Sequence, residues 1–334
     1  MPDLIMSVRA LMNDQFIADV GPTTFLNVPD GAMPLPAHAI PAAQWYQSIL
    51  QAAAWKNSNG EQRGDILFII HGYNMSEKEV IARHRRLKKD LINEGFLGVV
   101  VSFDWPSDDK ALAYLPDRHR AKLTAMQLVS DGIRKLSELQ TPSCKINIHV
   151  IGHSTGVYVI REAFDDADDT QLPNSSWGIS QIIFAAGDVS SASMSVGDSG
   201  AESVYLHSVR LTNYFSRHDE ALDLSNVKRI GNAPRVGRIG LPADAPSKAV
   251  NVDCTAYYEK LTTPGTLEAN LDQVNGFVGM QSHSWYFGNR MFTLDLLSVL
   301  IGTDRMVIPT RSVSADGKFL LQHIDKPVPP PKAP

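Results

Sequence analysis

The pentapeptide Gly152-His153-Ser154-Thr155-Gly156 has the residue types and spacing that nucleophilic catalysis by a serine requires. In the pattern G-x-S-x-G the serine stands on a sharp turn between a strand and a helix, where small neighbours leave room for a strained backbone. The flanking sequence fits this turn, because the β-branched run 145–151 precedes it and the helix-like segment 157–164 follows it. We predict that Ser154 is an acyl-transfer nucleophile. The alternative is a glycine-rich turn that carries an idle serine.

A second turn is a candidate for binding the oxyanion that acyl transfer produces. Enzymes of this chemistry use the N–H that follows the nucleophile and an N–H from the loop after an earlier strand. Thr155 supplies the first donor. The segment 71–74, His-Gly-Tyr-Asn, follows the apolar run 66–70, so the Tyr73 N–H is the candidate for the second donor. Alternatively, this segment only turns the chain.

Three sequence elements together resemble the α/β-hydrolases. They are the segment 71–74, the segment 103–107 (Phe-Asp-Trp-Pro-Ser) and the pentapeptide around Ser154. More narrowly, they resemble a bacterial subfamily of largely unassigned substrate, and the resemblance runs from about residue 64 to residue 290. It implies an eight-stranded, mainly parallel sheet, a Ser–acid–His triad and no cofactor.

In this fold the acid and the histidine follow the serine along the chain, which leaves four of the ten histidines as the general base. They are His207, His218, His283 and His323. His283 is favoured, because it follows the last predicted strand and precedes the helical run 289–301, where the resemblance also places the family's histidine. The alternative for His283 is a solvated loop residue.

Two acids compete to orient the histidine. Asp188 ends the predicted strand 181–186, and Asp219 follows the predicted strand 209–215. The residues by themselves leave both open, with Glu220 and Asp223 as further candidates. The resemblance favours Asp219, because the family most often carries the acid after the later strand.

Further residues flank these elements and are candidates for the substrate pocket: His71, Gly72, Asn74, Trp105 and His153. For Trp105 a turn packed on the core is the favoured alternative. The acidic run 165–169 is interpreted as a solvated loop at a helix end. No cluster of His, Cys, Asp or Glu has metal-ligand spacing, so neither a metal nor a cofactor is predicted.

Short apolar runs alternate with helix-like segments along the chain, which predicts an α/β fold with a mostly parallel sheet flanked by helices. The predicted strands are 66–70, 97–103, 145–151, 181–186, 209–215 and 249–257, and the long helices are 76–93 and 114–139. Runs 4–8 and 15–20 flank a polar Asn13-Asp14 and predict an antiparallel N-terminal edge. We expect one domain over 1–325, irregular loops over 224–283 that cover the site, and a disordered proline-rich tail over 326–334.

Composition excludes several classes of protein. Apolar residues are 43% of the chain and charged residues 20%, as in ordinary soluble globular proteins. The net charge of −5 argues against a nucleic-acid partner. The N-terminus lacks the features of a signal peptide, and no apolar run is long enough for a transmembrane helix. Two isolated cysteines fit a reducing compartment, so we expect a cytoplasmic protein.

Together these features predict a serine hydrolase that cleaves small-molecule carboxylic esters through an acyl-enzyme on Ser154. The ester is chosen by analogy with the commonest chemistry on this fold. A thioesterase, an amidase or peptidase, and a lipase are alternatives on the same residues. A non-catalytic binding protein of the same fold is an alternative of a different class.

Overall fold

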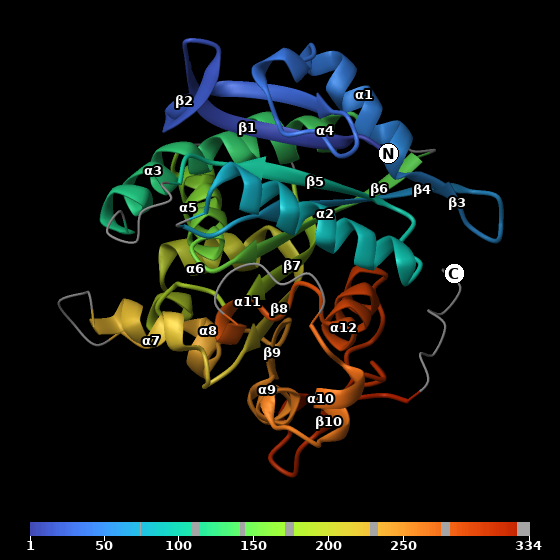
Figure 1. Cartoon of the computed structure of the whole chain (residues 1–334), viewed down its shortest axis with the longest axis vertical. Helices are drawn as coiled ribbons and strands as arrows, with labels where there is room; N and C mark the ends of the chain where they lie inside the picture. The colour runs from blue at the N-terminus through green and yellow to red at the C-terminus, as the bar shows by residue number, and fades with distance from the viewer. Residues whose placement is uncertain are drawn as a thin grey trace.

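An eleven-stranded sheet runs through the part of the chain that the computed structural model describes, residues 1–73, 75–107, 114–140, 144–170, 177–227, 233–274 and 281–325 (Figure 1). The strand order is β10-β11-β9-β8-β7-β6-β4-β5-β1-β2, and β3 pairs with β4. Eight strands are parallel, whereas β2, β3 and β10 are antiparallel additions. The predicted mostly parallel sheet of the α/β-hydrolase fold is therefore confirmed.

The parallel strands coincide with the apolar runs of the sequence. They are β1 (Asp3–Met12), β4 (Gln62–Ile70), β5 (Val99–Asp104), β6 (Cys144–His153), β7 (Ile179–Ala185), β8 (Ser208–Phe215), β9 (Ala249–Asp253) and β11 (Phe319–Leu321). The antiparallel strands are β2 (Gln15–Val28), β3 (Ala54–Lys56) and β10 (Arg311–Val313). The predicted strand 249–257 ends early: the Asp253 carboxylate accepts the Thr255 N–H (2.8 Å), and a helix begins there.

The N-terminal edge is a hairpin, as predicted. Asn13 and Asp14 have φ of 51° and 56°, a backbone conformation that suits a two-residue turn and that short polar side chains tolerate. The first strand of this hairpin, β1, pairs in parallel with β5, so of these two strands only β2 is antiparallel to the parallel strands.

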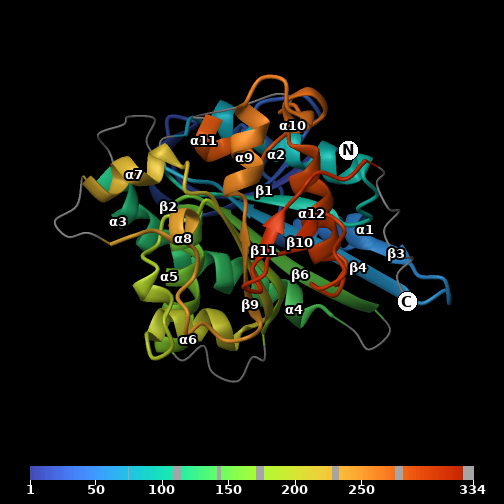
Figure 2. The same cartoon turned by 90° about the horizontal axis from the view of Figure 1, so that it is seen from below.

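Helices cover both faces of the sheet, because the side chains of each strand alternate between two buried clusters. In β4, Ile66, Phe68 and Ile70 belong to one cluster, and Leu67 and Ile69 to the other. The first cluster includes side chains of α1 (Ala42–Ala53), α3 (Tyr114–Gln127), α4 (Arg134–Glu138), α5 (Gly156–Asp169) and α6 (Ser199–Leu206). The second includes α2 (Glu77–Asn93), α9 (Thr255–Thr262) and α12 (Arg290–Leu300). Figure 2 shows α5 and α6 on one side of the sheet and α9 and α12 on the other.

Three predicted segments differ from the structure. The helix 114–139 is interrupted by a π-helical segment, Leu128–Ile133. The acidic run 165–169 lies inside α5 rather than in a loop, because the apolar stripe of that helix continues through the buried Ala167. The segment 224–283, expected to be irregular, contains β9, α9, α8 (Val236–Ile239) and α10 (Leu267–Leu271), the last turn of α7 (Glu220–Val227) and most of α11 (Gln281–Ser284).

Short 3-10 turns complete the described elements, at Pro36–His38 and Ala192–Met194. The tail 326–334 and Asn74 lie outside the described residues. Within the described ranges no helix is both long enough and apolar enough to cross a membrane.

Candidate active site

The residues singled out in the sequence follow five neighbouring parallel strands. His71, Trp105, Ser154, Asp188 and Asp219 come directly after, or shortly after, β4, β5, β6, β7 and β8. Parallel strands end at the same edge of a sheet, and ligands of open α/β sheets bind outside that edge. The fold therefore gathers these residues from positions up to 148 apart in the sequence.

Ser154 stands on a strained turn between β6 and α5. Its φ is +57°, a left-handed value that costs a non-glycine residue about 1–3 kcal/mol. The turn is held by its main chain, since the Ser154 N–H donates to Ala185 O (3.1 Å) and the Ser154 carbonyl accepts the Asp188 N–H (3.0 Å). A Cβ on Gly156 would lie 2.3 Å from Ile70 O, so only glycine lets α5 start against β4. This is the strand–turn–helix context that the G-x-S-x-G pattern requires.

The loop after β4 lies against this serine. A Cβ on Gly72 would come within 2.8 Å of the Ser154 Cβ. The loop is held by Trp105, whose Nε1 donates to His71 O (2.8 Å) and whose ring stacks on the His71 imidazole with 5.2 Å between centroids. His71 Nδ1 in turn donates to Gly72 O (2.8 Å). Trp105 is fully buried in the hydrophobic core, as the alternative for this residue expected, and it holds the loop that carries Tyr73 from beneath.

A buried ion pair beneath this loop was missed by sequence reasoning. The Asp104 carboxylate lies 3.4 Å from His71 Nε2, accepts a hydrogen bond from Ser7 Oγ (2.9 Å), and is bound by Arg9 Nε at 3.0 Å to each oxygen. Burial alone would raise the pKa of Asp104, but Arg9 and His71 outweigh it and lower the pKa to about 2. Asp104 stands next to Trp105 in the Phe-Asp-Trp-Pro-Ser element, and this position was the signal available in the sequence.

The structure brings His283 and Asp219 into contact. His283 lies in α11, and its Nδ1 is 2.7 Å from Asp219 Oδ2. Asp219 is fully buried and is held by further bonds: its Oδ1 accepts the Leu222 N–H (3.0 Å), its carbonyl accepts Arg238 Nη1 (3.0 Å), and its N–H donates to Ser216 O (3.1 Å). A carboxylate accepts, so Nδ1 carries the proton. In the neutral ring Nε2 is then the basic nitrogen.

The other candidate acid, Asp188, has a different partner. Its Oδ1 lies 3.1 Å from Arg235 Nε, and both side chains are almost completely buried. Asp188 contacts the turn through its main-chain N–H, which donates to Ser154 O. Asp219 is thus the acid that the structure joins to His283, and Asp188 lies beside the serine turn.

The imidazole of His283 is close to the serine turn. His153, which precedes Ser154, has its ring centroid 4.6 Å from that of His283, and its Nε2 donates to the His283 carbonyl (2.9 Å). In addition, Ser282 Oγ accepts the Glu220 N–H (3.3 Å). The short helix α11 is therefore fastened both to the turn and to the first residue of α7.

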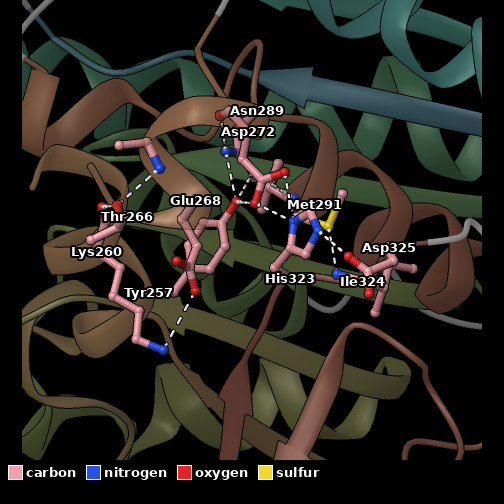
Figure 3. Close-up of polar contacts among 12 residues, drawn as sticks. Tyr257, Lys260, Thr266, Glu268, Asp272, Asn289, Met291, His323, Ile324 and Asp325 are labelled. Carbon is pink, nitrogen blue, oxygen red and sulfur yellow. Dashed lines mark hydrogen bonds and ion pairs between the residues drawn. The ribbon is translucent and has the colours of Figure 1, made fainter. Parts of the chain in front are cut away.

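His323, another candidate base, belongs to a polar cluster with Asp272, Tyr257 and Asn289 (Figure 3). Its Nδ1 contacts both oxygens of Asp272 at 2.9 Å. Tyr257 Oη donates to Asp272 Oδ2 (2.9 Å), and Asn289 Nδ2 donates to Tyr257 Oη and to Asp272 O, both at 3.1 Å. These bonds tie α9, the end of α10, the start of α12 and the C-terminal segment together, so they brace the part of the chain that carries α11.

The remaining candidates lie elsewhere or make other contacts. His207 precedes β8, at the opposite edge of the sheet, where it stacks on Trp177 and contacts Asp168 (2.7 Å). His218 is next to Asp219 in sequence, with its ring 6.0 Å from that of Tyr258. The Asp223 carboxylate lies 3.2 Å from Arg238. In the described ranges no three His, Cys, Asp or Glu residues are grouped so as to hold a metal ion.

Likeness to solved structures is distant. A dienelactone hydrolase from Anabaena variabilis ATCC 29413 is 15% identical, with 80% of this chain and 93% of that chain covered and a TM-score of 0.33. A thermostable esterase from Pseudomonas putida ECU1011 is 12% identical (79% and 89% covered, TM-score 0.31), and a cutinase-like protein from Cryptococcus sp. is 10% identical (75% and 100% covered, TM-score 0.34). No curated protein sequence matches the chain.

A family model does match, over residues 50–255. This range includes the loop after β4, the Phe-Asp-Trp-Pro-Ser element, the serine turn and both candidate acids. The chain belongs to the alpha/beta hydrolases of unknown function (DUF900).

Proposed function

We propose that the protein is a serine hydrolase that cleaves carboxylic esters of small molecules through an acyl-enzyme on Ser154. The observation that carries the proposal is the 2.7 Å contact between His283 Nδ1 and the buried Asp219 carboxylate, beside a serine held at φ +57°. A carboxylate on Nδ1 fixes the imidazole tautomer and stabilises the imidazolium that forms when Nε2 takes a proton.

The first half of the reaction transfers the acyl group to the enzyme. Ser154 Oγ attacks the carbonyl carbon of the ester while His283 Nε2 accepts the hydroxyl proton. The carbon–oxygen bond to the leaving group then breaks, and His283 returns the proton to the departing alkoxide. An alcohol leaves, and the acyl group remains on Ser154.

The second half releases the acid. A water molecule attacks the acyl-enzyme, and His283 Nε2 takes one of its protons. When the bond to Ser154 Oγ breaks, His283 gives that proton back to the serine. The free enzyme is restored and a carboxylic acid leaves.

Both halves pass through an oxyanion, for which we assign the N–H groups of Thr155 and Tyr73. Thr155 is the N-cap of α5, where N–H groups have no acceptor within the helix and the helix dipole favours negative charge. Tyr73 follows Gly72, the residue that passes against the Ser154 side chain. The Trp105 and Asp104 contacts support this assignment, since they fasten the loop that carries Tyr73.

A fluorophosphonate probe tests the proposal, because only an activated serine reacts with it quickly. We expect stoichiometric labelling at Ser154 and hydrolysis of p-nitrophenyl esters in a panel from acetate to palmitate. Matched thioesters and anilides in the same panel separate an esterase from a thioesterase or an amidase, and the preferred chain length separates it from a lipase. A folded protein that is neither labelled nor active on any substrate would be a binding protein, and the proposal would be wrong.

The choice of acid gives a prediction of its own. Asp219→Asn keeps the shape of the side chain but lets the amide donate to Nδ1, which favours the wrong tautomer of His283. We expect kcat to fall about a thousandfold or more. Asp188→Asn, the matched control, should cost far less, because Asp188 pairs with Arg235 and contacts the serine turn through its main chain. Both variants are assayed on one activated ester, with folding checked by thermal melting. The reverse result, an inactive Asp188→Asn and an active Asp219→Asn, would reassign the acid.

A further inference from the structure

A buried arginine lies next to the histidine that we propose as the base. Arg83 comes from α2, and only 3% of its surface is exposed. Its Nη1 contacts His153 Nδ1 at 2.8 Å, its Nη2 donates to Ser284 Oγ (3.2 Å), and its guanidinium lies over the Phe287 ring, 4.8 Å from the centroid. These partners come from the serine turn and from the segment that holds His283.

The contacts of His153 define its protonation. Its Nε2 faces the His283 carbonyl, which only accepts, so Nε2 carries the proton. Arginine only donates, so Nδ1 of His153 accepts from Arg83 and is unprotonated. His153 is thus neutral, and each ring nitrogen has one fixed partner.

The charged and titratable groups around His153 favour the same state. Burial lowers the pKa of His153 well below its usual value, and the charges of Arg83, His283 and His71 lower it further, which outweighs the hydrogen bond to the His283 carbonyl that raises it. These groups come from α2, from α11 and from the loop after β4. Burial also lowers the pKa of Arg83, to about 10. Arg83 therefore stays charged at neutral pH, and His153 stays neutral beside it.

We propose that Arg83 and His153 form a fixed relay that positions His283 for catalysis. Arg83 selects the His153 tautomer that donates to the His283 carbonyl, and it also holds Ser284, the next residue along the chain. His283 is then held through its main chain by this relay and through its imidazole by Asp219. Arg83 is a positioning residue, because its nearly complete burial and its packing on Phe287 leave it no surface for substrate.

The inference rests on the proposed function, and it explains why an arginine and a histidine are buried together here. A base misplaced by about 1 Å can cost a factor of about 100 in rate, so small losses of position are measurable. Loss of the relay should therefore lower kcat, which reports the chemical step, far more than it changes KM.

The first arm of the test replaces Arg83. Arg83→Met keeps the length of the side chain and removes its donors. We expect kcat to fall about 10- to 100-fold with KM changed less than about threefold. Arg83→Lys retains a donor and should recover part of kcat. The matched control is Arg86→Met on the same helix, where Arg86 is partly exposed and pairs with Asp90 (2.7 Å), and it should behave as wild type.

The second arm replaces His153. His153→Gln keeps an acceptor for Arg83 and a donor for the His283 carbonyl, so it should retain kcat within about threefold, whereas His153→Leu should lose about as much as Arg83→Met. A folded Arg83→Met enzyme with wild-type kcat, or a His153→Gln enzyme as impaired as His153→Leu, would overturn the relay. If Arg83→Met and His153→Leu do not fold, the kcat of His153→Gln still tests the relay: a value within about threefold of wild type supports it, and a larger loss overturns it.

A spectroscopic measurement separates the relay from the proposed function. The imidazole ¹⁵N spectrum of the wild-type protein should show His153 protonated on Nε2 and bare on Nδ1 over the whole pH range in which the protein is folded. A proton on His153 Nδ1 would overturn the relay even if the enzyme is active. Failure of Ser154 to react with the fluorophosphonate would refute the proposed function and leave this spectrum to decide whether the Arg83–His153 contact has the assigned form.

Discussion

Ser154→Ala is expected to lower kcat for an activated ester by a factor of about 10⁴ to 10⁶, because the nucleophile is removed and only the oxyanion donors and substrate binding remain. The fold should be unaffected. Alanine keeps the Cβ that already occupies the strained φ of +57°, and the main-chain bonds of residue 154 to Ala185, Val157 and Asp188 do not involve the hydroxyl. Initial rates, thermal melting and fluorophosphonate labelling are measured on the same preparation.

Ser208→Ala is a suitable control for this variant. Ser208 is also buried and begins β8 at the opposite edge of the sheet, where its hydroxyl donates to Val204 O (2.8 Å). Its loss should leave kcat close to the wild-type value. A Ser154→Ala protein with near-wild-type turnover and an unchanged circular dichroism spectrum would remove the nucleophile from the proposed mechanism.

His283→Ala should be nearly as damaging, because without the Nε2 base the serine hydroxyl stays protonated. Residues that act as one unit are not additive, so the Ser154→Ala, His283→Ala double variant should be only slightly worse than either single one. Truncation also leaves the buried Asp219 carboxylate without its imidazole donor, which destabilises the fold. The rates are therefore compared at a temperature where every variant is folded.

His207→Ala serves as the control for this series, since His207 lies at the other edge of the sheet with Asp168 and Trp177. It should retain activity. An active His283→Ala enzyme, or losses that add in the double variant, would point to another base, His218 or His323.

The local sequence pattern was sufficient to predict most of the strands and helices of the fold. The β-branched runs became β4 to β9, and the helix predicted over 76–93 is α2, which a capping box of Ser76 and Glu79 begins. The strand–turn–helix around Ser154 follows from the glycines and the strand before it. Two predicted boundaries were wrong. The strand 249–257 ends at Asp253, whose side chain accepts the Thr255 N–H, and the helix after Ser154 continues past residue 164 because its apolar stripe includes Ala167.

Chain order and motif by themselves determined that one serine turn, one loop after β4 and a small set of later acids and histidines would meet at the carboxyl edge of a parallel sheet. They left the choice between Asp188 and Asp219 to the resemblance, because each follows a strand that ends at that edge. The tertiary structure decided which contacts form: Asp219 reaches His283 across 64 positions in the sequence, and Arg235 takes Asp188. The contacts of Arg83 with His153 and of Arg9 with Asp104 were also visible only in the tertiary structure. A buried charge needs a polar partner, and here the partners lie 70 and 95 positions away in the sequence, so no local pattern predicts them.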